Sequence, residues 1–196
     1  MTVFLQILFA ALAAVTTENV LFSGGIGFSR VLRAARKPKL IGLYSVLIAL
    51  YSMIAMLISA GLYPFFQDGD LLLFVRPAVF SACIVVVYAV TAVALKALAA
   101  GFYKKYGPAF SLSAINTIVL SMPYAQKSFK LSLTEAAGFA VGTGAAFFLA
   151  TVLISYGAGR CRGEDMPKAF SGMPAAFLYI GILSLAFAGL TGGKLF

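Results

Sequence analysis

The sequence contains no histidine and no tryptophan, and it has two cysteines and only 6 acidic residues against 15 lysines and arginines. Zinc sites in proteins draw on histidine, cysteine and carboxylate ligands, and two cysteines without a histidine are too few for such a site. The same shortage excludes a hydrolase with a histidine base and a small fold held together by disulfides. The chemistry of this chain must therefore rest on other side chains.

Charge of either sign is also scarce. Charged residues make up 11% of the 196 residues and hydrophobic residues 62%, whereas a soluble domain carries charge on about a quarter of its residues. A soluble fold of this size cannot hide so much apolar surface, so the composition predicts an all-α integral membrane protein. The net charge of +9 does not indicate a nucleic-acid partner, because the basic residues lie between apolar stretches, as in proteins surrounded by membrane lipid.

Six segments poor in charge are each long enough to cross a bilayer as a helix. They cover residues 3–28, 40–67, 77–95, 106–126, 136–159 and 169–193. The first basic residue is Arg30, so the N-terminal segment lacks the positive start of a signal peptide and is predicted to be a true first span. We therefore expect a single membrane domain over residues 1–196.

The basic residues also predict an orientation. Eleven of them fall in the first, third and fifth loops and four on the opposite side. Because loops rich in lysine and arginine stay in the cytoplasm, both termini are expected on the non-cytoplasmic side.

Three spans in each half predict a three-plus-three inverted repeat, with halves of about 1–100 and 101–196. An odd number of spans forces a second copy to run the opposite way across the membrane. Spans one and four each carry an asparagine, Asn19 and Asn116, close to residues that disfavour helices. These are Ser23, Gly24, Gly25 and Gly27 in span one, and Gly107-Pro108 and Ser121-Met122-Pro123 in span four. We interpret both spans as broken helices that meet near the midplane; the alternative is that the glycines only allow close helix packing.

Other glycines fit helix packing better than a ligand role. Gly138, Gly142 and Gly144 in span five, and Gly181 with Ser184 in span six, have spacings that allow two helices to approach closely. We expect contacts between helices at these positions.

Glu18 is the only acid placed well inside a span. An ionisable group at membrane depth is costly unless it faces a cavity, a partner or a pathway. One hypothesis is a cation or proton pathway formed by Glu18, Asn19, Ser23 and Asn116. The other is that Glu18 is an interfacial acid that holds the helix break.

The two cysteines and the known nucleotide motifs add no site. Cys83 is expected to be a packed thiol in span three, and Cys161 a reduced thiol in the fifth loop. No phosphate-binding glycine loop, nucleophile elbow or dinucleotide fingerprint is present in the required setting.

Several stretches resemble the membrane subunits of Rnf and Nqr complexes, in particular the RnfA and NqrE type. The resembling stretches are Glu18-Asn19-Val20, Gly27-Phe28-Ser29, Arg36-Lys37, Ala114-Ile115-Asn116-Thr117, Gly138-Phe139-Ala140-Val141-Gly142, Asp165-Met166-Pro167 and 181–187. The resemblance covers nearly the whole chain. It implies a subunit of a redox-driven, ion-translocating complex in a bacterial-type inner (plasma) membrane, paired with an oppositely oriented RnfE/NqrD-like paralogue.

In that family, the resemblance implies, each of two paired subunits supplies one cysteine from span one and one from span four to an intramembrane [2Fe-2S] cluster. The matching positions here are Ser29 and Thr117. A hydroxyl is a poor substitute for a thiolate on iron. We therefore expect a divergent member that binds no cluster and no other metal by itself.

Three functions remain open from the sequence. The first is a membrane subunit of an Rnf/Nqr-type complex. The second is a stand-alone carrier that has kept the scaffold and binds a cation or small polar solute in a cavity lined by Glu18 and its neighbours. The third is a purely structural assembly subunit, for which substitution of Glu18, Asn116 or Thr117 would leave coupled activity intact.

Overall fold

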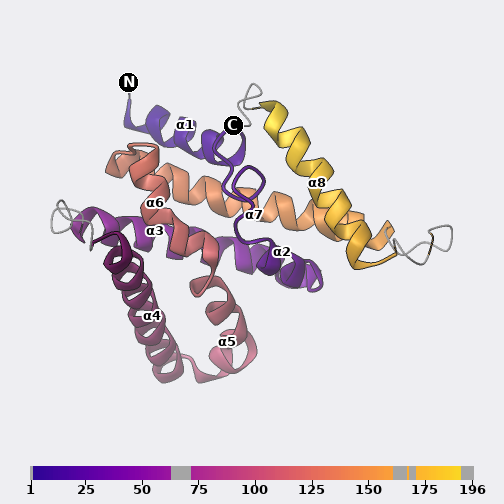
Figure 1. Ribbon diagram of the computed structural model, residues 1–196. Helices are drawn as coiled ribbons and strands as arrows, with labels where there is room; N and C mark the ends of the chain where they lie inside the picture. The colour runs from indigo at the N-terminus through magenta and orange to yellow at the C-terminus, as the bar shows by residue number, and fades with distance from the viewer. Residues whose placement is uncertain (1, 63–71, 161–166, 168–170, 191–196) are drawn as a thin grey trace.

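The computed structural model describes residues 2–62, 72–160, 167 and 171–190, and all regular structure in them is helical (Figure 1). In chain order the elements are α1 (Val3–Val15), α2 (Phe28–Ala35), the short 3₁₀ helix η1 (Pro38–Leu40), α3 (Ile41–Leu62), α4 (Leu72–Leu98), α5 (Ala100–Ala114), α6 (Thr117–Ser128), α7 (Leu133–Arg160) and α8 (Met173–Leu190). The described part of the chain is all-helical, as predicted.

Four helical stretches are long and apolar enough to cross a membrane. They are Pro38–Leu62, Val75–Leu98, Leu133–Gly157 and Met173–Leu190, and a shorter apolar helix covers Val3–Val15. Large apolar side chains stay exposed along these helices, among them Val46 on α3, Val93 on α4 and Ile182 on α8. Such surface is stable in contact with lipid, so the structure is that of a multi-pass membrane protein.

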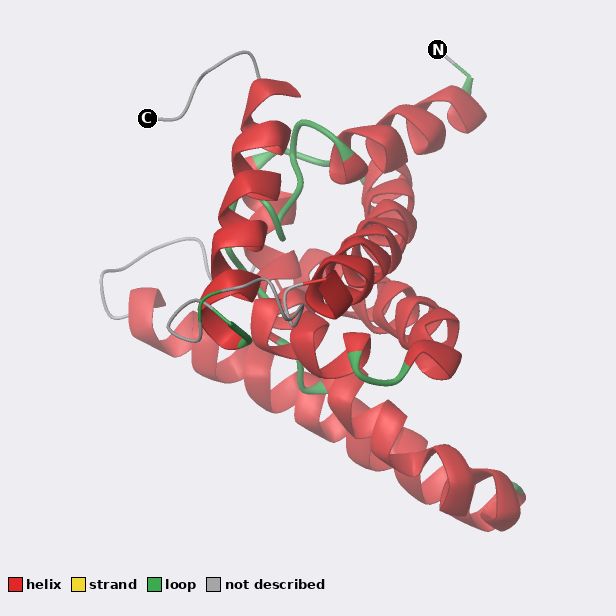
Figure 2. Cartoon of the chain, turned by 90° about the vertical axis from the view of Figure 1, so that its right-hand side faces the viewer, coloured by secondary structure: helices red, strands yellow, loops and turns green. Residues whose placement is uncertain are grey.

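Helix α7 lies at the centre of the molecule and packs against α1, α2, α3 and α8, while α5 and α6 pack on α3 (Figures 1 and 2). Its inward face carries Phe139, Phe147 and Ile154, which are at most 1% exposed. On the facing helix α3, Ile48 and Met56 are equally buried. The core is therefore formed mainly between the second half of the chain and α1 and α3 of the first half.

Glycines on α7 allow its neighbours to approach. A Cβ at Gly138 or Gly142 would meet the backbone of α1 at Ile7 or Ala11, respectively. A Cβ at Gly144 would lie 2.8 Å from the carbonyl oxygen of Ser45 on α3. The predicted close packing at these three glycines is confirmed, and it follows the small-residue spacing that lets membrane helices touch backbone to backbone.

The packing prediction is wrong at Gly181. A Cβ there would meet no atom within 4 Å, because this face of α8 is turned toward a cavity and not toward a helix. Gly181 and Ser184 both line that cavity.

The chain leaves helical geometry between α5 and α6, at Ile115 and Asn116 only. Asn116 has extended dihedral angles (φ −122°, ψ 136°), and its side chain accepts a hydrogen bond from the N–H of Ile118, so it forms the N-cap of α6. The prolines expected to loosen this region, Pro108 and Pro123, lie inside α5 and α6. A proline removes one hydrogen bond from a helix without having to end it, and here the cap at Asn116 marks the interruption.

Candidate functional site

A segment of twelve residues, 16–27, joins α1 to α2, and Asn19 organises its first turns. The Nδ2 of Asn19 donates to the carbonyl of Val15 at 2.7 Å, and its Oδ1 accepts from the N–H groups of Leu21 at 3.1 Å and Phe22 at 3.2 Å. Asn19 is fully buried. Its amide therefore satisfies backbone groups that the end of α1 leaves open.

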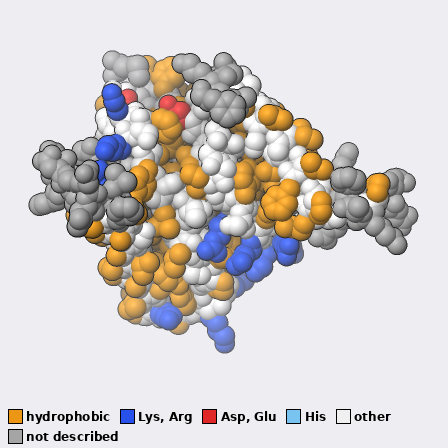
Figure 3. Space-filling model, viewed as in Figure 1, with side chains coloured by type: hydrophobic (Ala, Val, Ile, Leu, Met, Phe, Trp, Pro, Cys, Tyr) orange, Lys and Arg blue, Asp and Glu red, His pale blue; other side chains and the backbone are white. Residues whose placement is uncertain are grey.

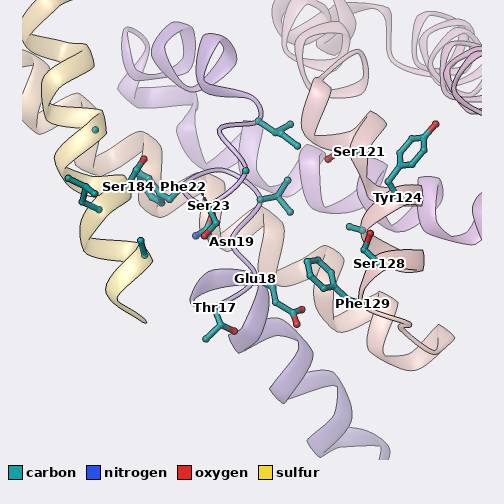
Figure 4. Close-up of a pocket in the computed structure, with 17 residues that line it drawn as sticks. Thr17, Glu18, Asn19, Phe22, Ser23, Ser121, Tyr124, Ser128, Phe129 and Ser184 are labelled. Carbon is teal, nitrogen blue, oxygen red and sulfur yellow. Dashed lines mark hydrogen bonds between the residues drawn. The ribbon is translucent and has the colours of Figure 1, made fainter. Parts of the chain in front are cut away.

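The segment borders a cavity of about 800 Å³ that also involves α6 and α8. The polar side chains around it come from three parts of the chain: Thr17, Glu18, Asn19 and Ser23 from the segment, Ser121, Tyr124 and Ser128 from α6, and Ser184 from α8. Figure 4 shows the side chain of Glu18 extending from the segment into the space on the α6 side. The cavity thus has one carboxylate among hydroxyl groups.

The chemistry of this lining favours a cation or a proton. Its polar side chains offer oxygen atoms, with one amide, and neither lysine nor arginine is among the lining residues. Carboxylate and hydroxyl oxygens are suitable ligands for hard cations. An acid that faces such a cavity at membrane depth can be stabilised by the ion or proton that it binds.

Three of the four residues predicted for a polar pathway, Glu18, Asn19 and Ser23, line this cavity. Asn116 does not. It lies at the interruption between α5 and α6 and lines a separate small cavity together with Arg30 and Ser113.

The positions that match the family's cluster ligands lie at the starts of two short helices. Ser29 is in the first turn of α2 and Thr117 is the first residue of α6, and both are exposed. A Cβ at Gly27, the N-cap of α2, would overlap the side chain of Ile118. The starts of α2 and α6 therefore adjoin, and Thr117 shares a cavity of about 500 Å³ with Gly27 and Ser121.

The donor atoms at this junction do not fit an iron–sulfur cluster. Ser29 and Thr117 offer hydroxyls with very high pKa where a cluster needs thiolates. Cys83 is half-buried on α4, and Cys161 lies outside the described residues. Within the residues that the structure places, no three His, Cys, Asp or Glu side chains gather as metal ligands.

Gly27→Ala tests whether the two helix starts press on each other. Gly27 has φ of +91°, which L-residues rarely adopt, and its Cβ would displace the flexible side chain of Ile118. We expect a loss of about 1–2 kcal/mol in stability, measured by thermal unfolding in detergent. The double variant with Ile118→Ala should recover part of this loss. If the second change brings no recovery, the contact with Ile118 is not part of the cost.

Several cavity residues were missed from the sequence. Ser121, Tyr124, Ala125 and Ser128 all line the cavity from α6. Their spacing of three, four and seven residues is that of one helix face, so the signal was present once α6 was known to begin at Thr117. The contact of Arg30, whose Nη2 donates to the carbonyl of Ile115 at 2.9 Å, joins residues 85 positions apart and has no local signal.

Comparison with known proteins identifies relatives of this chain. It is 30% identical over 121 residues to the A-type subunit of the proton-translocating ferredoxin:NAD(+) oxidoreductase complex of Clostridium ljungdahlii, which covers 62% of this chain and 63% of the relative. It is 30% identical over 119 residues to the A-type subunit of the ion-translocating oxidoreductase complex of Glaesserella parasuis, covering 61% and 62%. The protein of the same name from Shewanella sediminis is 29% identical over 145 residues, covering 74% and 73%.

The matched stretch thus spans less than two thirds of the length of the Clostridium and Glaesserella relatives. The family model described as "Rnf-Nqr subunit, membrane protein" covers more, from residue 7 to residue 193. On this match the chain belongs to the Rnf-Nqr family of membrane subunits.

Proposed function

We propose that this chain is a membrane subunit of an Rnf/Nqr-type ion-translocating oxidoreductase complex, and that it provides no cluster ligand of the usual kind. The family match over residues 7–193, together with relatives named as A-type subunits of such complexes, carries the proposal. The hydroxyls at Ser29 and Thr117 support its second part. The proposed partner is an oppositely oriented RnfE/NqrD-like subunit.

The proposed architecture is a three-plus-three inverted repeat of six spans in one domain, in which α1 with α2, and α5 with α6, each form one broken span. Each half then has two short helices followed by two long ones. The contacts support this pairing, because α1 and α2 pack on α7 of the second half whereas α5 and α6 pack on α3 of the first. Exchanged contacts of this kind are expected where two inverted copies interlock.

We further propose that both termini lie on the non-cytoplasmic side of a bacterial plasma membrane. On the face drawn in Figure 3, acidic side chains lie near the top and most lysine and arginine side chains lie in the lower half. Basic surface on one side of a membrane protein marks its cytoplasmic side. The cavity with Glu18 would then face the other side or the membrane interior.

In this complex the cavity of about 800 Å³ would serve as the ion-binding or proton-binding chamber, with Glu18 as the charged ligand and Ser23 as a neighbouring oxygen donor. Asn19 would hold the segment that carries them. Asn116 would act at the second broken span.

A second candidate is a stand-alone carrier for a cation or small polar solute. The specific observation in its favour is that an oxygen-lined cavity of this size is present where both matching thiolates are missing. The two candidates differ in what accompanies the protein in its native membrane.

Purification of the tagged chain in mild detergent, with mass spectrometry of what remains attached, distinguishes them. Flavin-bearing and iron–sulfur-bearing Rnf or Nqr subunits in the purified material would support the complex. Recovery of the chain alone or paired with itself would overturn the complex and favour the carrier.

Glu18→Gln tests the chamber. In the purified complex reconstituted into vesicles, we expect redox-driven ion uptake to fall by at least about tenfold, since the loss of about 1.4 kcal/mol in ion binding is sufficient for that. The control is Glu135→Gln. Glu135 accepts hydrogen bonds from Ser132 at the start of α7, and glutamine can keep that cap. Uptake that survives Glu18→Gln unchanged would remove Glu18 from the pathway.

A further inference from the structure

A small enclosed cavity of about 10 Å³ lies beside the interruption between α5 and α6. Arg30 and Arg33 line it from α2, Tyr44 from α3, Ser113 from α5, and Asn116 from the interruption itself. It shares no lining residue with the larger cavity around Glu18. The two are therefore separate sites with different chemistry.

Two polar atoms in this lining are buried without a hydrogen-bond partner, the Nδ2 of Asn116 and the Oγ of Ser113. Asn116 is 1% exposed and Ser113 is completely buried. The amide of Asn116 cannot simply be turned over, because its Oδ1 accepts from the N–H of Ile118 at 3.2 Å. Its NH₂ group is thus held in a position where the protein supplies no acceptor.

Ser113 differs from other buried hydroxyls of this chain. Ser45, Thr143 and Thr151 each donate to the carbonyl four residues earlier in their helix. The hydroxyl of Ser113 makes no such bond. Buried polar groups are almost always paired with protein or with ordered water, so two unpaired atoms in the lining of one cavity indicate a missing partner.

We propose that this cavity holds one ordered water molecule that accepts a hydrogen bond from Asn116 Nδ2 and donates one to Ser113 Oγ. Its volume is that of a single water. A cation does not fit, because two guanidinium groups line the cavity and the amide offers only N–H groups. The carbonyl of Ile115 at the interruption is already satisfied by Arg30, so the water is needed only by the two side chains.

The water would fix the geometry of the interruption. Asn116 would bind the first turn of α6 through its oxygen and, through its nitrogen and the water, the last turn of α5 at Ser113. This inference does not depend on the proposed function of the chain, since it rests on the pairing of buried groups.

Thermal unfolding of the purified full-length chain gives a test in which the sign decides. If the water is present, Ser113→Ala removes one of its partners and should lower the Tm by about 2–4 °C. If the cavity is dry, the same change removes an unpaired buried hydroxyl and should leave the Tm unchanged or raise it. The control is Ser111→Ala on the same helix, whose hydroxyl donates to the carbonyl of Pro108 at 3.1 Å and does not line the cavity. An unchanged or raised Tm for Ser113→Ala overturns the proposal.

A crystal structure of the unaltered chain, grown once with chloride and once with bromide, provides an independent measurement. Density within hydrogen-bonding distance of both atoms, with no anomalous signal from bromide, supports the water. An empty cavity, or a bromide ion bound beside the arginines, overturns it.

Discussion

Gly142→Leu is expected to prevent the chain from folding. At this position α7 crosses α1 so closely that a Cβ would overlap the carbonyl oxygen of Ala11 and lie 2.7 Å from its Cα. The atoms in the way belong to the backbone, so they cannot rotate aside, and leucine adds three more carbon atoms beyond the Cβ. A cost of about 3 kcal/mol or more is a large part of the total stability of a domain. The measurement is the yield of monodisperse protein by size-exclusion chromatography in detergent.

Gly181→Leu is the matched control for this change. It places the same side chain on another apolar helix, at a glycine where a Cβ would meet nothing within 4 Å. We expect a yield close to that of the unaltered chain. Equal yields for the two leucine variants would contradict the close packing of α1 on α7.

Asn19→Ala is expected to have the next largest effect on stability. The change removes one donor and one acceptor that together satisfy three backbone groups, those of Val15, Leu21 and Phe22. Because Asn19 is fully buried, water cannot easily replace the lost bonds. Each buried group left without a partner costs about 1–3 kcal/mol, so a loss of about 3 kcal/mol or more is expected. Thermal unfolding in detergent measures it.

Thr17→Ala serves as the comparison, since Thr17 is exposed two residues earlier in the same segment. It should shift the midpoint by at most about 0.5 kcal/mol in equivalent stability. If Asn19→Ala unfolds no earlier than Thr17→Ala, the segment is not organised by the Asn19 side chain, and its place in the chamber has another cause.

The helical content and the long spans could be predicted from the sequence because hydropathy alone determines them. Uninterrupted apolar stretches account for α3, α4, α7 and α8. The glycines of α7 could be predicted as contact points from their spacing. Gly181 shows the limit of that reasoning, since the same residue type at a similar spacing faces a cavity when no helix lies opposite.

Local signals also misplaced one feature. Pro108 and Pro123 are strong helix breakers in isolation, yet both lie inside helices. The interruption occurs at Asn116, whose side chain provides the cap.

The candidate site was predictable only in part. Glu18 and Ser23 stood out as polar residues in an apolar span, and both line the cavity. The hydroxyls of Ser121, Ser128 and Ser184 reach the same cavity from α6 and α8, which are far away in sequence. Which face of these helices turns inward depends on how they pack against the rest of the chain, and a single sequence does not contain that information.

The contact of α1 with α7 also has a consequence for the synthesis of the protein. The backbone around Ala11 meets Gly142, so α1 acquires its main neighbour only after about 130 further residues have left the ribosome. At about 5–20 residues per second this takes roughly 7–26 s. During that time α1, a helix of 13 residues that is shorter than a full span, must remain in the membrane without the surface that later covers it. The order of synthesis therefore places the last stage of assembly at α7, and truncated chains that end before it should be cleared by membrane proteases.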